Sequence, residues 1–139
     1  MKGAKQFKAD FSDLDEILDW VRDVFESFDE LEKAKKFEIA VEEAVVNVVH
    51  YAYHGSSPGN LYLSYVMGEE RFDFEIKDQG KPFNPLENPK SFDEDAVLEE
   101  REIGGLGIHF ILKMTDAATY KRVDGSNILT LSFHLKKKV

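Results

Sequence analysis

Apolar residues recur at helical spacing in two consecutive stretches of the N-terminal half. A spacing of three and four residues places side chains on one face of a helix. The first stretch predicts a helix that Ser12 caps and that ends near Phe28. The second predicts a longer helix over residues 29–53, which Gly55 terminates. The expected buried positions are Leu14, Ile17, Leu18, Val21, Val24 and Phe25 in the first helix, and Leu31, Ala34, Phe37, Val41, Ala44, Val45 and Val48 in the second.

Alternation of apolar and polar residues, which is typical of half-buried strands, follows these helices. Four such segments form two pairs, each joined by a short turn: residues 61–66, 72–76, 118–123 and 128–135. Each pair predicts a β-hairpin, residues 5–11 predict a first strand, and residues 108–114 predict a further helix. We therefore expect an α+β fold. It is a two-layer α/β sandwich in which one mixed, mainly antiparallel sheet of about four or five strands is covered on one face by helices.

The segment from residue 79 to residue 103 has a different composition. It contains three of the four prolines, together with many charged residues. It is too long for a simple connection, so it is either a functional lid or a disordered segment. A short helix over residues 93–100 is expected within it.

Bulk composition narrows the class of protein. The 139 residues are the size of one domain, and 42% hydrophobic residues with 11 Phe suffice for a core. The net charge of -9 argues against nonspecific binding to the phosphate backbone of nucleic acids. The absence of Cys excludes disulfides and thiolate metal sites. The sequence has no signal peptide and no stretch long enough to span a membrane, so a soluble cytoplasmic protein without membrane contact is expected.

The second predicted helix carries an acid and an amide four residues apart, Glu43 and Asn47, which therefore share one face. Mg²⁺ prefers oxygen ligands and borrows several from phosphate and water, so the Asn47 carbonyl oxygen could bind a phosphate-bound ion. Glu43 could polarise a water or an incoming hydroxyl. The simpler interpretation is that both residues lie on a solvated helix face.

Two glycine-containing motifs follow in fixed order. Asp78-Gln-Gly80 closes a predicted strand; its carboxylate could accept a hydrogen bond from an adenine amino group, or it could be an ordinary strand-ending turn. The run Gly104-Gly105-Leu106-Gly107 opens a predicted helix, where free backbone N–H groups form an anion site. The alternative is a flexible hinge and helix cap. No Lys-Ser or Lys-Thr follows, so the run is not a Walker motif.

The order and spacing of these motifs resemble the small Bergerat-fold ATP-binding proteins of the anti-sigma factor and serine-protein kinase type. These belong to the wider histidine kinase, gyrase and Hsp90-like (GHKL) ATPase superfamily. Glu43-x-x-x-Asn47 resembles the N box, Asp78-x-Gly80-x-x-Phe83 the first glycine box, and Gly104-Gly-Leu-Gly-Ile-His the second. The resemblance covers roughly residues 7–135. One departure is Tyr-Ala-Tyr at residues 51–53, where this subgroup usually has His-Ala-Tyr or His-Gly-Tyr.

The resemblance implies a role for each motif. Glu43 would be the general base, Asn47 would hold Mg²⁺, and Asp78 would read adenine, with Gly80 lining the base pocket. The glycines of the second box would shape the phosphate turn, and residues 79–103 would form the ATP lid of a single domain over residues 1–139. The cofactor-binding residues that it implies are Asn47, Asp78, Gly80, Phe83, Arg101, Gly104, Gly105, Leu106, Gly107, Ile108 and Asn127.

The implied activity is that of a regulatory serine/threonine protein kinase and anti-sigma factor. Such a protein transfers the γ-phosphate of ATP to a Ser or Thr of a small antagonist protein and sequesters a sigma factor. Two alternatives stay open at this point: a non-catalytic, nucleotide-sensing module that sequesters a protein partner, and an adaptor with a degenerate site. Expected partners are proteins rather than nucleic acid. Family members often form homodimers, although no residue of this sequence establishes one.

Overall fold

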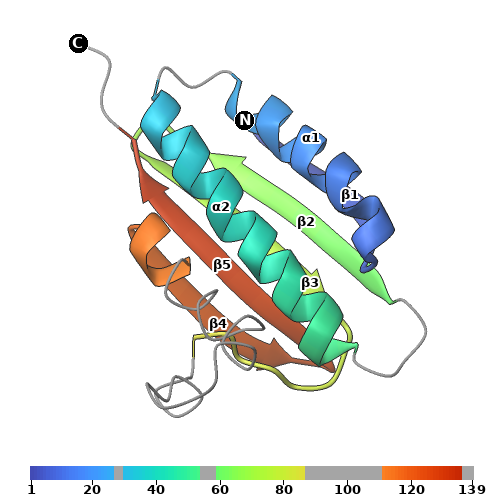
Figure 1. Ribbon diagram of the computed structural model, residues 1–139. Helices are drawn as coiled ribbons and strands as arrows, with labels where there is room; N and C mark the ends of the chain where they lie inside the picture. Colours follow the sequence, from blue (N-terminus) through green and yellow to red (C-terminus); the bar gives the residue numbers. More distant parts are fainter. Residues whose placement is uncertain (27–29, 54–58, 87–110, 136–139) are drawn as a thin grey trace, which may run out of the picture.

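The computed structural model describes residues 1–26, 30–53, 59–86 and 111–135. The described strands form a five-stranded sheet in the order β1-β2-β3-β5-β4, and all of its strand pairs are antiparallel. Two long helices cross one face of this sheet (Figure 1). The strands are β1 (Lys2–Lys8), β2 (Asn60–Met67), β3 (Arg71–Asp78), β4 (Ala117–Val123) and β5 (Ser126–His134), and the helices are η1 (Phe11–Asp13), α1 (Leu14–Phe25), α2 (Leu31–Asn47) and η2 (Val48–Ala52). The expected α+β sandwich is confirmed, and the sheet is antiparallel rather than mixed.

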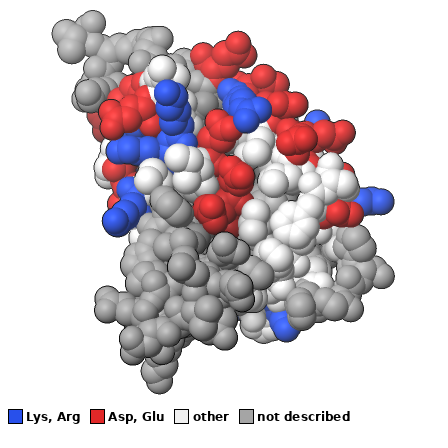
Figure 2. Space-filling view, in the orientation of Figure 1, with Lys and Arg blue, Asp and Glu red and all other residues white. Residues whose placement is uncertain are grey.

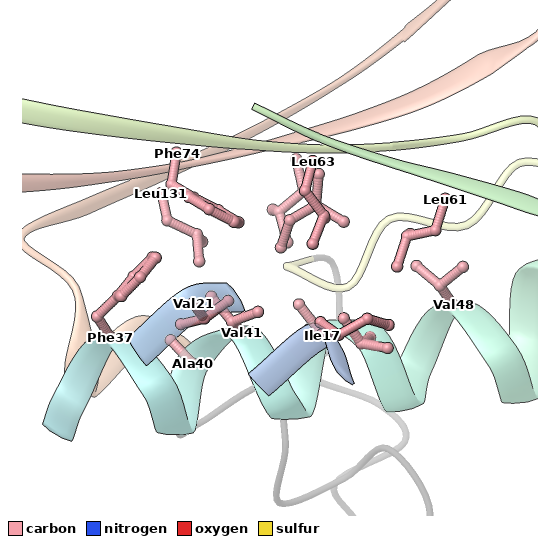
Figure 3. Close-up of a cluster of buried hydrophobic side chains, with 14 of the residues drawn as sticks. Ile17, Val21, Phe37, Ala40, Val41, Val48, Leu61, Leu63, Phe74 and Leu131 are labelled. Carbon is pink, nitrogen blue, oxygen red and sulfur yellow. The ribbon is translucent and has the colours of Figure 1, made fainter. Parts of the chain in front are cut away.

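The core lies between the helices and the inner face of the sheet. Strand β3 alternates buried and partly exposed positions, so every second side chain points toward the helices. Phe37 of α2 is fully buried and makes edge-to-face contacts with Phe72, Phe74 and Phe133 at centroid distances of 5.2, 4.8 and 5.6 Å. Figure 3 shows helical and strand side chains meeting in this layer. The buried stripe of α2 thereby fixes which helix face meets the sheet.

The start of α1 differs from the prediction. Ser12 is not its cap: Ser12 lies in the 3₁₀ helix η1, and its N–H donates to the Asp10 carboxylate at 3.1 Å. Asp10 therefore caps the short 3₁₀ turn, and α1 begins after it. The helix ends at Phe25 rather than near Phe28.

The second helix also differs near its C-terminal end. Its α-helical part ends at Asn47, and residues Val48–Ala52 form the π-helix η2. There the N–H of Tyr53 donates to the carbonyl oxygen of Val48 at 3.2 Å, five residues earlier. A π-turn holds one residue more than an α-turn, so it changes the direction of every side chain that follows.

The hairpin and helix predicted in the C-terminal part are confirmed within the described residues. Asp124 and Gly125 both have positive φ angles, 48° and 81°, which is typical of a two-residue turn between strands. Residues 111–114 are helical, and Ile111 is fully buried. The helix predicted over residues 93–100 lies outside the described residues. No described helix has the length and apolar character that crossing a membrane requires.

Candidate functional site

A pocket of about 280 Å³, its open mouth included, lies between the C-terminal half of α2 and the adjoining ends of the strands. The segment that follows β3 passes beside this end of α2 (Figure 1). The pocket is lined by Ala44, Asn47, Val48, Ile76, Asp78, Phe83, Pro85, Tyr120, Asn127 and Leu129. Its lining is therefore largely apolar, with a small number of polar groups that could orient a ligand.

Asp78 is the last residue of β3 and points to the inner face of the sheet. Its side chain is buried, with 3% of its surface exposed. Its Oδ1 accepts hydrogen bonds from Gly80 N and from Asn127 Nδ2, both at 2.9 Å. Burial raises the pKa of Asp78, while the bonds from Asn127 and Gly80 and the charge of Arg122 act in the opposite direction. Because both bonds use Oδ1, Oδ2 is the oxygen available to a donor in the pocket.

Asn127 joins four parts of the site through one buried amide. Its Nδ2 donates to Asp78 Oδ1 and to the carbonyl oxygen of Lys81, both at 2.9 Å. Its Oδ1 accepts from the Tyr120 hydroxyl at 2.5 Å and from Phe83 N at 3.2 Å. Strands β3, β4 and β5 and the segment after β3 are thus tied together at this side chain. Asn127, which the family resemblance implied to be a cofactor-binding residue, lies directly against Asp78.

Asn47 lies on the helical side of the pocket. Only 2% of its surface is exposed, and within the described part of the chain its Nδ2 is a buried donor without a hydrogen-bond partner. An unpaired buried polar group costs about 1–3 kcal/mol, so it indicates a partner that a ligand would supply. The alternative that Asn47 lies on a solvated helix face is wrong, because the side chain is buried.

Glu43 lies one helical turn before Asn47 on the same face of α2, outside the pocket lining. It is half-buried. Burial, and secondarily the neighbouring charge of Glu42, raises the pKa of Glu43. A carboxylate whose pKa is raised toward neutrality is a better proton acceptor than a fully solvated one.

Gly80 occupies a position with no room for a side chain. A Cβ there would lie 2.4 Å from the carbonyl oxygen of Ala52 in η2. Lys81 N donates to that same oxygen at 2.9 Å. The close contact of Gly80 is therefore with the end of η2, and Gly80 is not one of the residues that line the pocket.

Phe83 brings the segment after β3 against both the pocket and the helix. Its ring is stacked on Tyr51 of η2, with centroids 4.8 Å apart and planes inclined by 15°. It also lines the pocket. Tyr51 therefore contributes packing at the rim of the site.

The remaining predicted site residues are not described by the structure. Arg101, Gly104, Gly105, Leu106, Gly107 and Ile108 all lie within residues 87–110, outside the described ranges. The expectations that concern the phosphate turn and most of the lid therefore stay predictions. Within the described part of the chain, no group of three or more His, Cys, Asp or Glu side chains could hold a metal ion. The carbonyl oxygen of Asn47 would fit an ion that borrows further oxygens from a nucleotide.

Two β4 residues that lie at the site, Tyr120 and Arg122, had no role predicted from the sequence. Tyr120 donates to Asn127, and Arg122 Nη1 donates to the Gly80 carbonyl oxygen at 2.7 Å. Counting outward from the turn at residues 124–125 pairs Arg122 with Asn127. Once Asn127 is taken as a site residue, this pairing in the predicted hairpin would have identified Arg122 as its neighbour.

Comparison with protein families identifies a match along most of the chain. A family model described as "Histidine kinase-like ATPase domain" matches residues 7–133. A protein named serine-protein kinase RsbW from Staphylococcus epidermidis is 31% identical over 118 residues, covering 81% of this chain and 72% of that protein. A protein of the same name from Listeria monocytogenes serovar 1/2a is 28% identical over 112 residues, covering 78% of this chain and 71% of that protein.

Solved structures support the same fold. The RsbU and RsbW domains of Rv1364c from Mycobacterium tuberculosis match with a TM-score of 0.70 at 12% identity, over 100% of this chain. This chain spans only 34% of that longer chain. The Acinetobacter baumannii histidine kinase AdeS matches with a TM-score of 0.50 at 16% identity, over 96% of this chain and 68% of that one. At these identities the likeness concerns the fold.

Proposed function

We propose that this chain, which belongs to the family of histidine kinase-like ATPase domains, is an ATP-dependent serine/threonine protein kinase. Its similarity to proteins named serine-protein kinase RsbW supports this activity. The observation that carries the proposal is the pairing of two buried polar groups across one apolar pocket. Asp78 is held on the strand side, and Asn47 has an unpaired Nδ2 on the helical side. A nucleotide has complementary groups for both.

The base would bind at the Asp78 side of the pocket. Oδ1 of Asp78 is engaged by the protein, so Oδ2 would accept a hydrogen bond from the adenine amino group. The apolar lining and the Phe83 ring suit the faces of a flat base. These contacts support a preference for adenine, because guanine carries a carbonyl where adenine carries the amino group.

The phosphates would then extend toward the helix. An amide carries both an acceptor and donors, so Asn47 could bind Mg²⁺ through its oxygen while its Nδ2 donates to an oxygen of the nucleotide. When bound, Mg²⁺ would neutralise charge on the phosphates. Glu43, one turn away, would accept the proton of the attacking Ser or Thr hydroxyl, and the raised pKa of Glu43 suits that role.

The partners would be proteins. In this proposal the phosphate goes to a Ser or Thr of a small antagonist protein, and the chain also sequesters a sigma factor. Figure 2 shows Asp and Glu side chains gathered along the helical face, which suits a basic partner. Exposed acids on this layer include Asp15, Glu16, Asp19 and Asp23 of α1.

Calorimetric titration of ATP with Mg²⁺ into the wild type and Asp78→Ala tests the nucleotide site. We expect binding to the wild type and loss of binding to the variant. Transfer of radiolabelled γ-phosphate from ATP to a Ser or Thr of candidate antagonist proteins then tests the kinase activity. Nucleotide binding without any transfer would favour the non-catalytic sensing module, and no nucleotide binding by the folded wild type would favour the adaptor.

A further inference from the structure

The Tyr53 hydroxyl lies between a backbone group at the start of β2 and one that directly follows β3. Gln79 N donates to the Tyr53 hydroxyl oxygen at 2.7 Å, and that hydroxyl donates to the carbonyl oxygen of Asn60 at 2.8 Å. The ring packs so closely on Gly59 that a Cβ there would lie 2.1 Å from it. Tyr53 is therefore held by its ring while its hydroxyl bridges the start of β2 and the residue after β3.

This bridge replaces a hydrogen bond of the sheet. At the turn of the β2–β3 hairpin, Gly68 N donates to the carbonyl oxygen of Arg71 at 2.9 Å. In an antiparallel ladder such bonded pairs recur at every second position. Counting along the printed register from this pair leads to Asn60 and Gln79 as a bonded pair. A direct bond from Gln79 N to the Asn60 carbonyl oxygen would continue the sheet, and the Tyr53 hydroxyl occupies its place.

The inserted hydroxyl has consequences for Asp78. The chain leaves the sheet at Gln79 and passes along the end of η2, where Lys81 N bonds to the Ala52 carbonyl oxygen. Gly80 lies between these two attachments and donates its N–H to Asp78 Oδ1 at 2.9 Å. The turn that orients the Asp78 carboxylate is thus attached to consecutive residues of the helix end.

The π-turn of η2 presents the hydroxyl in this direction. It adds a residue before Tyr53, whose N–H bonds to the Val48 carbonyl oxygen. Burial raises the pKa of the Tyr53 hydroxyl, so it stays protonated and keeps a hydrogen to donate while its oxygen accepts. A hydroxyl is the smallest side-chain group that can serve a donor and an acceptor at once.

We propose that Tyr53 is a positioning residue for base recognition: its hydroxyl ends the β2–β3 ladder one pair early and so fixes the turn that aims Asp78 into the pocket. This inference rests on the base-reading role proposed for Asp78. It assigns the hydroxyl, rather than the bulk of the ring, to nucleotide selectivity.

The test compares ATP with purine riboside triphosphate, which lacks only the amino group that Asp78 would read. We expect the wild type to bind ATP roughly tenfold or more tightly than the analogue, because a hydrogen bond to a charged group is lost. Tyr53→Phe keeps the ring and removes the hydroxyl. We expect its preference for ATP to fall to about twofold or less, with the affinity for the analogue unchanged. Tyr65→Phe, on β2 beside Trp20 and away from Asp78, is the matched control and should keep the wild-type preference.

A second measurement does not depend on nucleotide. Amide hydrogen exchange of Gln79 should accelerate by about tenfold or more in Tyr53→Phe and stay unchanged in Tyr65→Phe. An intact ATP preference in Tyr53→Phe would overturn the inference, and so would an equal loss of affinity for both nucleotides. A wild type without any preference, or without nucleotide binding, would contradict the base-reading role itself. In that case the exchange of the Gln79 amide in Tyr53→Phe still tests whether Tyr53 positions the turn. Accelerated exchange would support that role, and unchanged exchange would overturn it.

Discussion

Nδ2 of Asn127 lies 2.9 Å from Oδ1 of Asp78, although the two residues are 49 positions apart in the sequence. They are partners in the β3–β5 register, and both side chains are buried. Their contact fixes one oxygen of the carboxylate and leaves the other for a ligand. It also links the candidate base-reading residue to the segment that leaves β3.

Asn127→Ala should destabilise the protein and weaken ATP binding together. The substitution removes an amide that makes four hydrogen bonds. Since each buried bond contributes about 1 kcal/mol, a loss of about 2–4 kcal/mol in the free energy of unfolding is expected from urea denaturation. Asn84→Ala, which removes only a local bond to Leu86 N, is the control and should cost under about 1 kcal/mol. Equal effects of the two variants would contradict a central role for Asn127.

Gly80→Ala should destabilise the turn after β3 by steric overlap. Its new Cβ would lie 2.4 Å from the Ala52 carbonyl oxygen, so the turn and the end of η2 have to separate. Overpacking of this kind costs about 1–3 kcal/mol, and we expect lower ATP affinity with it. Gly68→Ala is the matched control, because its Cβ would lie 3.6 Å from its nearest neighbour. Thermal unfolding of both variants distinguishes the contact from a general cost of replacing glycine.

Asp78→Asn should abolish ATP binding without loss of stability at neutral pH. In the folded protein burial raises the pKa of Asp78 above its ordinary value of 3.8, so folding favours the protonated form. The stability contributed by that form is fully present below pH 3.8 and is lost as pH rises through the raised pKa. The unfolding free energy of the wild type minus that of Asp78→Asn should therefore fall as pH rises from below 3.8 toward neutrality.

Urea denaturation across this pH range checks the sign of the change. Asp124→Asn, at an exposed turn position with φ of 48°, serves as the control for replacing an aspartate by asparagine. A difference for Asp78 that grows with pH would mean that the ionised carboxylate stabilises the fold.

Glu43→Gln should separate nucleotide binding from phosphate transfer. The substitution keeps the shape of the side chain but removes the proton acceptor, so ATP affinity should be retained. The rate of transfer to a Ser or Thr of the partner should fall by about 10²–10⁴-fold, as for loss of a general base. Glu32→Gln, at an exposed position in the first turn of α2, is the control and should transfer phosphate at nearly the wild-type rate. Equal rates for the wild type and Glu43→Gln would remove Glu43 from this role.

Much of the fold could be predicted from local patterns. The stripe that includes Phe37 and Val41 identified the buried face of α2, and the alternation around Phe72 and Phe74 identified the inner face of β3. Both patterns report burial on one side, which the packing of helices on a sheet requires. The end of α2 was not predictable in the same way, because the π-turn of η2 has no pattern that distinguishes it from a continuing helix.

The residues of the candidate site were likewise predictable only where the signal was local in the sequence. The sequence identified Glu43, Asn47 and Asp78 by their residue types and by their positions in the predicted elements. The family resemblance supplied their roles. The burial of Asn47 and the bonds of Arg122 could not be found, because they depend on how the strand ends meet the helix. The residues of the second glycine box lie outside the described ranges, so their roles stay predictions.

The sequence by itself determined the types of the elements, the faces that they bury and the three motifs that point to a nucleotide, because helix and strand periodicity and residue chemistry are local properties. Tertiary structure decided which oxygen of Asp78 is free, which amide holds the other, and where the Tyr53 hydroxyl interrupts the β2–β3 ladder. Each of these relationships joins groups that only strand register and the approach of a helix end bring within hydrogen-bond distance.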